Sequence, residues 1–382
     1  MTERTRRTAV LARRLAAASA VAVLLLARAA SAGQAVSFSG SAFADRWWLS
    51  DQTTSKRSPS GTTIDGAIKI GVDISENVTF SSKACVSCHG LEFESIQLEY
   101  MPKSWFNVAA GRFPVPFGEF SNRVDQSGHK TTSAPLIYDM GRMAYGEKTA
   151  MNLGVVPLPY VDTGVLVYGN RFLGPVQAWY GAYLVGGFRG GNDVDWTSMR
   201  SIYYTNSNKV PGGGGRLVLT YAAPAGGLIG DTSIGGSVTT GRYDQAGTLG
   251  YLAWGADATM QLWKLTLRGE YAWRRTDLSP QASYPYDSSD LWYKKDGYYV
   301  ELEHPLGSYL GMVYRVDGLQ RVGLPLPGAD PELTTRSRIT RYTAGVVITP
   351  ETSFFVKLGY EYWRPSDFPS FNSIHFGVGG AF

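Results

Sequence analysis

The sequence lacks the features that mark helical membrane proteins, amphipathic helices and common catalytic sites. After residue 32 it contains no long apolar run, which excludes helical membrane spans. No segment has the periodicity of a convincing amphipathic helix. No constellation of His, Asp and Ser suggests hydrolysis, and no glycine-rich phosphate loop is present. These absences favour a strand-built protein that is neither a hydrolase nor a group-transfer enzyme.

A basic surplus is also missing from most of the chain. The full sequence has 36 Lys and Arg against 32 Asp and Glu, a net charge of +4. Residues 1–32 hold six of those arginines and one of the glutamates, so the remaining chain has a net charge of −1. The basicity belongs to the first 32 residues, and no nucleic-acid partner is indicated.

Residues 1–32 have the layout of a secretory signal peptide. A basic segment from Arg4 to Arg14 precedes an apolar run from Leu15 to Ala27, and Ala30-Ser31-Ala32 resembles a cleavage site. The apolar run is shorter than the ~20 residues that a spanning helix needs, which argues against a membrane anchor. We therefore expect an export signal at 1–32 and a mature chain at 33–382.

The mature chain is rich in stretches where apolar and polar side chains alternate. In residues 263–274 the odd positions would face lipid, while Lys264, Arg268, Glu270 and Arg274 would face a lumen. Residues 373–382 alternate too and end in Phe382, like the last strand of bacterial outer-membrane proteins. This pattern is typical of a transmembrane β-barrel. A soluble β-sandwich also alternates, but its connections would not divide so regularly into short and long.

The pattern predicts an all-β fold, a transmembrane antiparallel barrel of about 16 strands. The expected strands are 36–49, 64–73, 77–83, 91–101, 104–113, 160–169, 174–186, 213–222, 230–241, 250–260, 263–275, 296–304, 308–317, 336–348, 353–363 and 371–382. Short connections fall at every second position, as periplasmic turns should. The long ones, including 114–159, 187–212, 276–295 and 318–335, would face outward.

The only two cysteines lie in the most informative motif, Cys85-Val86-Ser87-Cys88-His89. Its C-x-x-C-H spacing is that of c-type haem attachment. Each thiol can form a thioether to a haem vinyl group, and the histidine can ligate the iron. We predict one covalent haem c in a loop at 85–90, bound by Cys85, Cys88 and His89. The alternatives are a Cys85–Cys88 disulfide or a redox-active dithiol.

The second axial ligand of the haem iron is expected to be His129, which lies in the long connection 114–159. His304, His375 and several methionines are further candidates. The side of the membrane depends on residues 75–77. If they form a turn, the motif lies outside or in the barrel mouth. If they form a kink, 64–83 is one strand and the haem faces the periplasm. The even strand count favours the turn.

The chain resembles the phosphate-selective porins of the O and P type. The resemblance rests on Leu98-Glu99-Tyr100-Met101-Pro102-Lys103-Ser104-Trp105 and on Gly111-Arg112-Phe113-Pro114-Val115-Pro116-Phe117-Gly118. It implies that the following connection, 114–159, folds into the barrel and constricts it. The expected lumenal charges are mixed and do not indicate phosphate selectivity: Arg112, Lys264, Arg268, Arg315, Arg341 and Lys357 with Asp257, Glu270, Glu301, Glu303, Asp317 and Glu361.

The haem motif adds a resemblance to the fused cytochrome–porin proteins of iron-oxidising bacteria, although here about 50 residues separate signal and motif, more than in that family. It implies a single-haem barrel of the Gram-negative outer membrane that transfers electrons. A periplasmic cytochrome or an extracellular electron donor or acceptor would be its partner, with outer-membrane lipid around it and a homotrimer as a possible assembly. The alternative function is a passive diffusion porin for anions or small solutes, in which the haem or a Cys85–Cys88 disulfide is structural.

Overall fold

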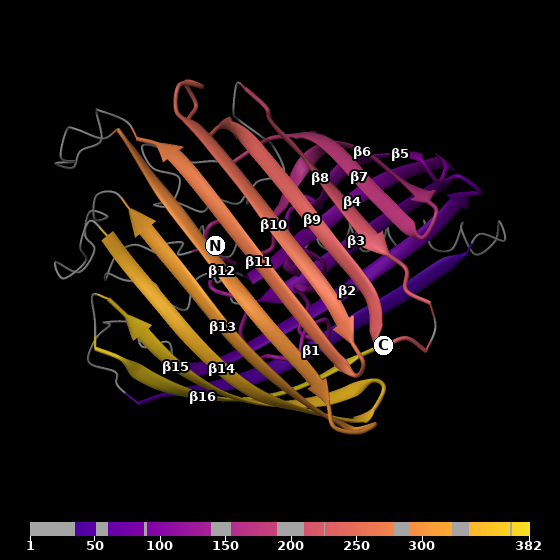
Figure 1. The fold of residues 1–382 in the computed structure, drawn as a ribbon. Helices are drawn as coiled ribbons and strands as arrows, with labels where there is room; N and C mark the ends of the chain where they lie inside the picture. Colours follow the sequence, from indigo (N-terminus) through magenta and orange to yellow (C-terminus); the bar gives the residue numbers. More distant parts are fainter. Residues whose placement is uncertain are drawn as a thin grey trace, which may run out of the picture.

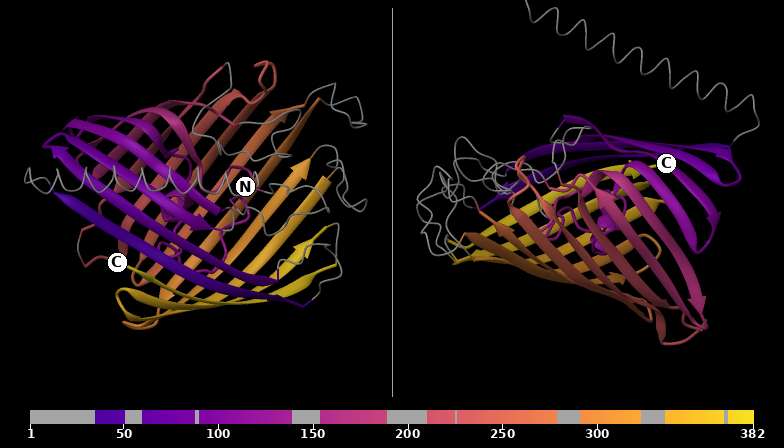
Figure 2. Two further views of the ribbon diagram at one scale, coloured as in Figure 1. Left: turned by 180° about the vertical axis from the view of Figure 1, so that it is seen from behind. Right: turned by 90° about the horizontal axis from the view of Figure 1, so that it is seen from above.

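The computed structural model describes residues 35–50, 60–87, 90–138, 154–188, 210–224, 226–278, 291–322, 336–366 and 369–382. These residues form one closed antiparallel barrel of sixteen strands, and β1 pairs with β16 to complete the circle (Figures 1 and 2). The expected all-β barrel is confirmed. The signal peptide expected at 1–32 lies outside the described residues. No helix in the described part of the chain is long and apolar enough to cross a membrane.

The sixteen strands agree with the expected set to within a few residues at each end. Their bounds are β1 Val36–Leu49, β2 Gly61–Ser75, β3 Val78–Ser87, β4 Gly90–Lys103, β5 Phe106–Pro114, β6 Val161–Leu173, β7 Val176–Val185, β8 Gly212–Tyr221, β9 Ile229–Arg242, β10 Gly250–Leu262, β11 Leu265–Asp277, β12 Trp292–Pro305, β13 Leu310–Val322, β14 Arg336–Glu351, β15 Phe354–Pro365 and β16 Phe371–Ala381. A single 3-10 turn, η1 Phe120–Arg123, is described between β5 and β6.

Strand β10 shows why these segments become strands of a barrel. Its burial alternates residue by residue, with Tyr251 and Ala253 buried while Leu252 and Trp254 are each 42% exposed on the outer surface. In a strand, successive side chains point to opposite faces. The outer surface is therefore apolar and the inner surface holds the charged residues, as a lipid-embedded barrel requires.

The barrel closes between the first and last strands. Nine residue pairs join β1 to β16, from Ser41 opposite Ala381 to Leu49 opposite Ser373. Gly40 and Phe382 then exchange two backbone hydrogen bonds of 2.9 Å. The terminal phenylalanine expected on the last strand is thus part of the seam.

The connections divide between the two ends of the barrel. One end carries short turns, such as Glu76-Asn77 between β2 and β3 and Ser104-Trp105 between β4 and β5. Residues 76–77 form a turn, not a kink, so the end of β3 lies at the opposite rim with the long connections. If the short turns are periplasmic, the haem motif is on the extracellular side, as preferred from the strand count.

Two local expectations need correction. The strands β3 and β4 run on to Ser87 and Gly90, so Cys85 lies within a strand and not in a loop. Lys264 does not face the lumen, because it lies in the turn between β10 and β11 with its amine 5.1 Å from the centre of the Trp263 ring. Turn residues are free of the inward–outward alternation on which that expectation rested.

Candidate functional site: a lumen filled by the loop after strand β5

The connection after β5 folds into the barrel, as the porin resemblance implies (Figure 2). Its described parts are residues 115–138 and 154–160, and we call 115–138 the inner loop. Its apolar side chains Phe117, Phe120, Leu136, Ile137 and Tyr138 are completely buried. They form one cluster with aromatic residues of the barrel wall, so the inner loop has a core of its own inside the lumen.

Glu270 of β11 anchors the start of the inner loop. Its carboxylate accepts the backbone N–H groups of Glu119 and Phe120, each at 3.2 Å, and the hydroxyl of Tyr138. Gly118 passes over this carboxylate with φ +69°, and a Cβ there would collide with both Glu270 and Tyr138. Only glycine fits this close approach in a left-handed conformation.

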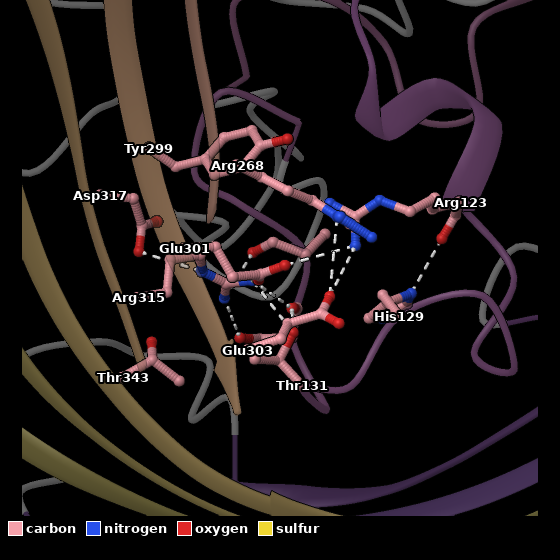
Figure 3. A network of polar contacts seen from close by, with 12 residues as sticks. Arg123, His129, Thr131, Arg268, Tyr299, Glu301, Glu303, Arg315, Asp317 and Thr343 are labelled. Carbon is pink, nitrogen blue, oxygen red and sulfur yellow. Dashed lines mark hydrogen bonds and ion pairs between the residues drawn. The ribbon is translucent and has the colours of Figure 1, made fainter. Parts of the chain in front are cut away.

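The wall formed by β12 to β15 holds fully buried charges that are paired with one another and with the inner loop (Figure 3). Arg315 lies 3.4 Å from Glu301 and from Asp317. Arg341 lies 2.7 Å from Asp317. The carboxylate of Asp317 also accepts the Leu136 N–H at 2.8 Å. Removing one partner of such a buried pair leaves an uncompensated charge and costs about 3–5 kcal/mol.

Arg123 links η1 to the same wall. Its guanidinium lies 2.8 Å from Glu119 and 3.3 Å from Glu301, and Glu303 is 3.6 Å away (Figure 3). Burial alone would lower the pKa of Arg123, but Glu119 and Glu301 outweigh it and raise the pKa. Arg123 is therefore a permanent cation that holds η1 against β12.

The middle of the inner loop is bound to β15 and β16. The amine of Lys357 donates to the carbonyls of Gln126 and Thr131. His375, stacked on Trp47 at 3.7 Å between ring centres, contacts the Thr132 hydroxyl at 2.7 Å. His375 thus lines the lumen as expected, but as a structural contact of the inner loop.

The wall formed by β2 and β3 is much more open. No described side chain of β2 or β3 between residues 61 and 86 is buried, whereas Glu301, Asp317, Arg341 and Glu361 have no exposure at all. The inner loop is therefore held against β9 to β16, and it also reaches β3 through Asp125 and Lys83. The inward-facing side chains of β2 and β3 keep contact with water, and we call the space beside them the open part of the lumen.

Cys85 faces this open part of the lumen. Its thiol donates to Glu94 at 2.9 Å, while the next residue, Val86, is 52% exposed on the outer surface. Glu94 also contacts the amine of Lys83 at 2.9 Å, and Lys83 lies 2.6 Å from Asp125 of the inner loop. Cys85 is a free thiol; Cys88 and His89 lie outside the described residues.

His129 belongs to the inner loop and is 4% exposed. Its Nδ1 lies 2.9 Å from the Arg123 carbonyl and 3.0 Å from the Asp125 carbonyl, so Nδ1 carries the proton. Nε2 has no hydrogen-bond partner among the described residues. Burial lowers the pKa of His129 well below its ordinary value, and the positive charges of Lys357 and Arg123 act in the same direction.

Cys85 and His129 are therefore joined by one polar chain through Glu94, Lys83 and Asp125. Cys85 and His129 were expected from the sequence to be site residues, whereas Glu94, Lys83 and Asp125 between them were not. The alternation of Lys83, Ala84, Cys85 and Val86 was the available signal that β3 extends to the motif. Within the described residues no cluster of three or more His, Cys, Asp or Glu is arranged to hold a metal ion.

No family model and no curated protein matches this sequence. Among solved structures, the anion-selective porin from Comamonas acidovorans aligns with a TM-score of 0.58 at 11% identity, over 91% of this chain and 100% of that one. Salmonella typhi OmpF, in a complex with daunomycin, gives a TM-score of 0.56 at 10% identity, over 91% and 97%. OmpT of Vibrio cholerae in a trimer form gives 0.54 at 10%, over 91% and 99%.

These likenesses concern the fold. The chain has the sixteen-stranded barrel of outer-membrane porins, with a loop folded into the lumen. The expected location in a Gram-negative outer membrane is supported by the closed barrel, its apolar outer surface and the outer-membrane proteins that share its fold.

Proposed function

We propose that this protein is an outer-membrane diffusion porin whose lumen is narrowed by the inner loop. The observation that carries the proposal is the unequal filling of the lumen: buried charge pairs hold the loop against β9 to β16, while the inner faces of β2 and β3 remain open to water. Passive diffusion was the alternative function in the sequence analysis. The porin fold supports diffusion better than it supports electron transfer, the function that the haem motif predicts.

The test is conductance of the purified mature protein in a planar bilayer. We expect stepwise ion conductance, and uptake of small sugars into liposomes that declines as the sugar becomes larger. Protein boiled before reconstitution is the control. Absence of conductance from protein that still migrates as a folded barrel on an unboiled gel would overturn the proposal.

A second candidate function, electron transfer through a covalent haem c, is favoured by the position of Cys85. Its thiol is directed into the open side of the lumen, at the rim with the long connections. Addition of the Cys85 and Cys88 thiols across the two haem vinyl groups would form the thioethers with no leaving group, and His89 would ligate the iron. Bound haem would supply one-electron chemistry.

His129 would be the further ligand of the iron in a bound haem, because its Nε2 is unprotonated and has no partner in the described part of the chain. The ring is buried against Phe120, with 5.2 Å between ring centres, so ligation would require the inner loop to shift. A single haem would not cross an apolar band of about 25 Å alone. A periplasmic cytochrome or an extracellular donor or acceptor would complete the route.

Mass spectrometry of the denatured mature protein separates the two functions. Covalent haem predicts one added haem mass that is absent from the C85A/C88A variant. A mass with two free thiols or one disulfide would eliminate the electron-transfer function and leave the porin function intact.

We also propose a homotrimer, on the basis of the fold shared with OmpT of Vibrio cholerae, which has a trimer form. Light scattering of the detergent-solubilised protein should give three chains per particle. A single chain per particle at all concentrations would rule this assembly out.

A further inference from the structure

The inner face of β2 to β4, which we call the acidic wall, carries more carboxylates than amines. Ile64 and Ile68 are 67% and 56% exposed on the outside, so the odd positions from Asp65 to Asp73 point into the lumen. On β4, Leu91 and Phe93 face outward. The lumenal set is Asp65, Asp73, Glu92, Glu94 and Glu99, with Lys69 and Lys83 as the amines.

Near the short-turn end, the carboxylates of the acidic wall have neutral partners. Asp73, which is exposed, accepts the Thr79 hydroxyl at 3.1 Å. Glu99 accepts the Tyr168 hydroxyl at 2.9 Å and an amide N–H of Gln97. Hydroxyl and amide donors satisfy the oxygens without cancelling the charge, so this end of the wall is negative.

The middle of the acidic wall is balanced. Lys83 pairs with Glu94 and with Asp125 of the inner loop, and Lys69 lies opposite Lys83 in the strand register. In the middle of the wall, the two positive charges of Lys69 and Lys83 therefore balance the two negative charges of Glu94 and Asp125. Beyond it, toward the long-connection rim, Glu92 lies opposite Cys85 and Asp65 follows on β2. The wall is thus neutral in its middle and negative at the short-turn end, where Asp73 and Glu99 lie.

Among the described residues, the other lumenal charges that form ion pairs add little to the field that a passing ion meets. Arg216 forms an ion pair with Asp257 at 2.6 Å. The charged side chains of β12 to β15 are paired with one another beneath the inner loop. Paired buried charges cancel at short range, whereas exposed charges act on ions within about 10 Å at 0.1 M salt. The acidic wall is the charged surface beside the open part of the lumen.

We propose that small cations are the preferred solutes of this channel and that the acidic wall, through Asp73 and Glu99, sets that preference. The proposal rests on the diffusion function above and specifies its solute class. A cation at the short-turn end of the channel is attracted by these two carboxylates, and an anion is repelled there.

The test is the reversal potential of the reconstituted protein in a gradient of KCl. We expect a K⁺ to Cl⁻ permeability ratio above one at 0.1 M salt, falling toward one at 1 M, where screening shortens to about 3 Å. A unit charge about 10 Å away in water changes the local concentration of a monovalent ion by roughly twofold. The D73N/E99Q variant should therefore lower the permeability ratio at least roughly twofold.

The matched control is D296N. Asp296 lies opposite the outward-facing Trp273, on the outer surface of the barrel, so its neutralisation should leave the ratio unchanged. A ratio of one or below in the wild type, or a ratio that D73N/E99Q leaves unchanged, would overturn the cation preference while conductance preserves the porin function. Absence of conductance would overturn the porin function and the preference together. Migration as a folded barrel on an unboiled gel checks each variant.

Discussion

At the scale of single residues, the inner loop is held in the lumen by charged side chains that are buried from water. Arg315, Asp317, Arg341 and Glu361 have at most 1% exposure, and each takes part in at least one ion pair. An apolar lining could be filled by many side chains, but a charged lining accepts only a loop that presents matching donors and acceptors. These residues therefore select one position of the inner loop.

Replacing Glu270 by alanine should release the start of the inner loop. The substitution leaves two backbone N–H groups and the Tyr138 hydroxyl without their acceptor, at about 1–3 kcal/mol for each buried donor. We expect larger single-channel conductance and faster proteolysis between residues 115 and 138. E270Q, which keeps one acceptor oxygen, should change both less. Unchanged conductance in E270A would mean that the loop does not limit flow at this point.

His129 should make docking of the inner loop depend on pH. Because its native pKa is depressed, the protonated form favours the undocked loop. Its contribution is complete above the unfolded value of about 6.5 and is lost as pH falls below it, by at most about 1.4 kcal/mol per pH unit. Hydrogen-exchange protection of residues 115–138 should decrease from pH 6.5 to 5 in the wild type. The decrease should be smaller in H129N, whose amide can still donate to the two carbonyls.

At the scale of strands, the pair β3–β4 brings the haem motif to the open side of the lumen. The pairing has an irregularity between Lys83 and Ala84, where Glu94 is the extra residue of β4. A bulge of this kind re-aims a side chain. It brings the Glu94 carboxylate to both Cys85 and Lys83, which ties the motif to the inner loop.

A charged methanethiosulfonate reagent should reduce conductance when it modifies Cys85 in haem-free C88A protein. The thiol points into the open part of the lumen, so the added group narrows the path. The control is C85A/V86C/C88A, in which the thiol faces outward. Equal inhibition of both variants would contradict the assignment of Cys85 to the lumenal face.

The strands could be predicted from the sequence because lipid on one side and polar lumen on the other impose a period of two on every segment. The docking of the inner loop could not be predicted, because the residues that bind it follow no periodic pattern in the sequence. Glu119 lies 151 residues before its partner Glu270. Thr132 lies 243 residues before His375. Haem ligation by Cys85 and His129 stays a prediction. Glu94, Lys83 and Asp125, which join the two residues in one chain of lumenal contacts, had no motif to reveal them.

At the scale of the whole molecule, closure depends on the last residues of the chain. The ring of Phe382 covers Gly40, where a Cβ would lie 2.7 Å from it, and the two residues share a pair of backbone hydrogen bonds. The terminal strand expected from its alternation and final phenylalanine is therefore also the element that completes the circle.

Deleting Phe382 should weaken the seam more than F382A does. Deletion removes two backbone hydrogen bonds, each contributing about 1 kcal/mol, as well as the ring, whereas F382A removes only the ring. After refolding in detergent, the fraction of compact barrel on an unboiled gel should fall in the order wild type, F382A, deletion. Equal fractions for the deletion and the wild type would show that the seam does not need this residue.

The long separation between the inner loop and its partners has a consequence for biogenesis. The loop emerges after β5, but Glu270, Asp317, Lys357 and His375, which hold it, are synthesised far later. Contacts between such distant positions form slowly because a large chain loop must be closed first. During export, the charged side chains of the loop and of β11 to β16 must therefore remain hydrated or bound to a chaperone. They can meet one another only as the second half of the barrel assembles around them.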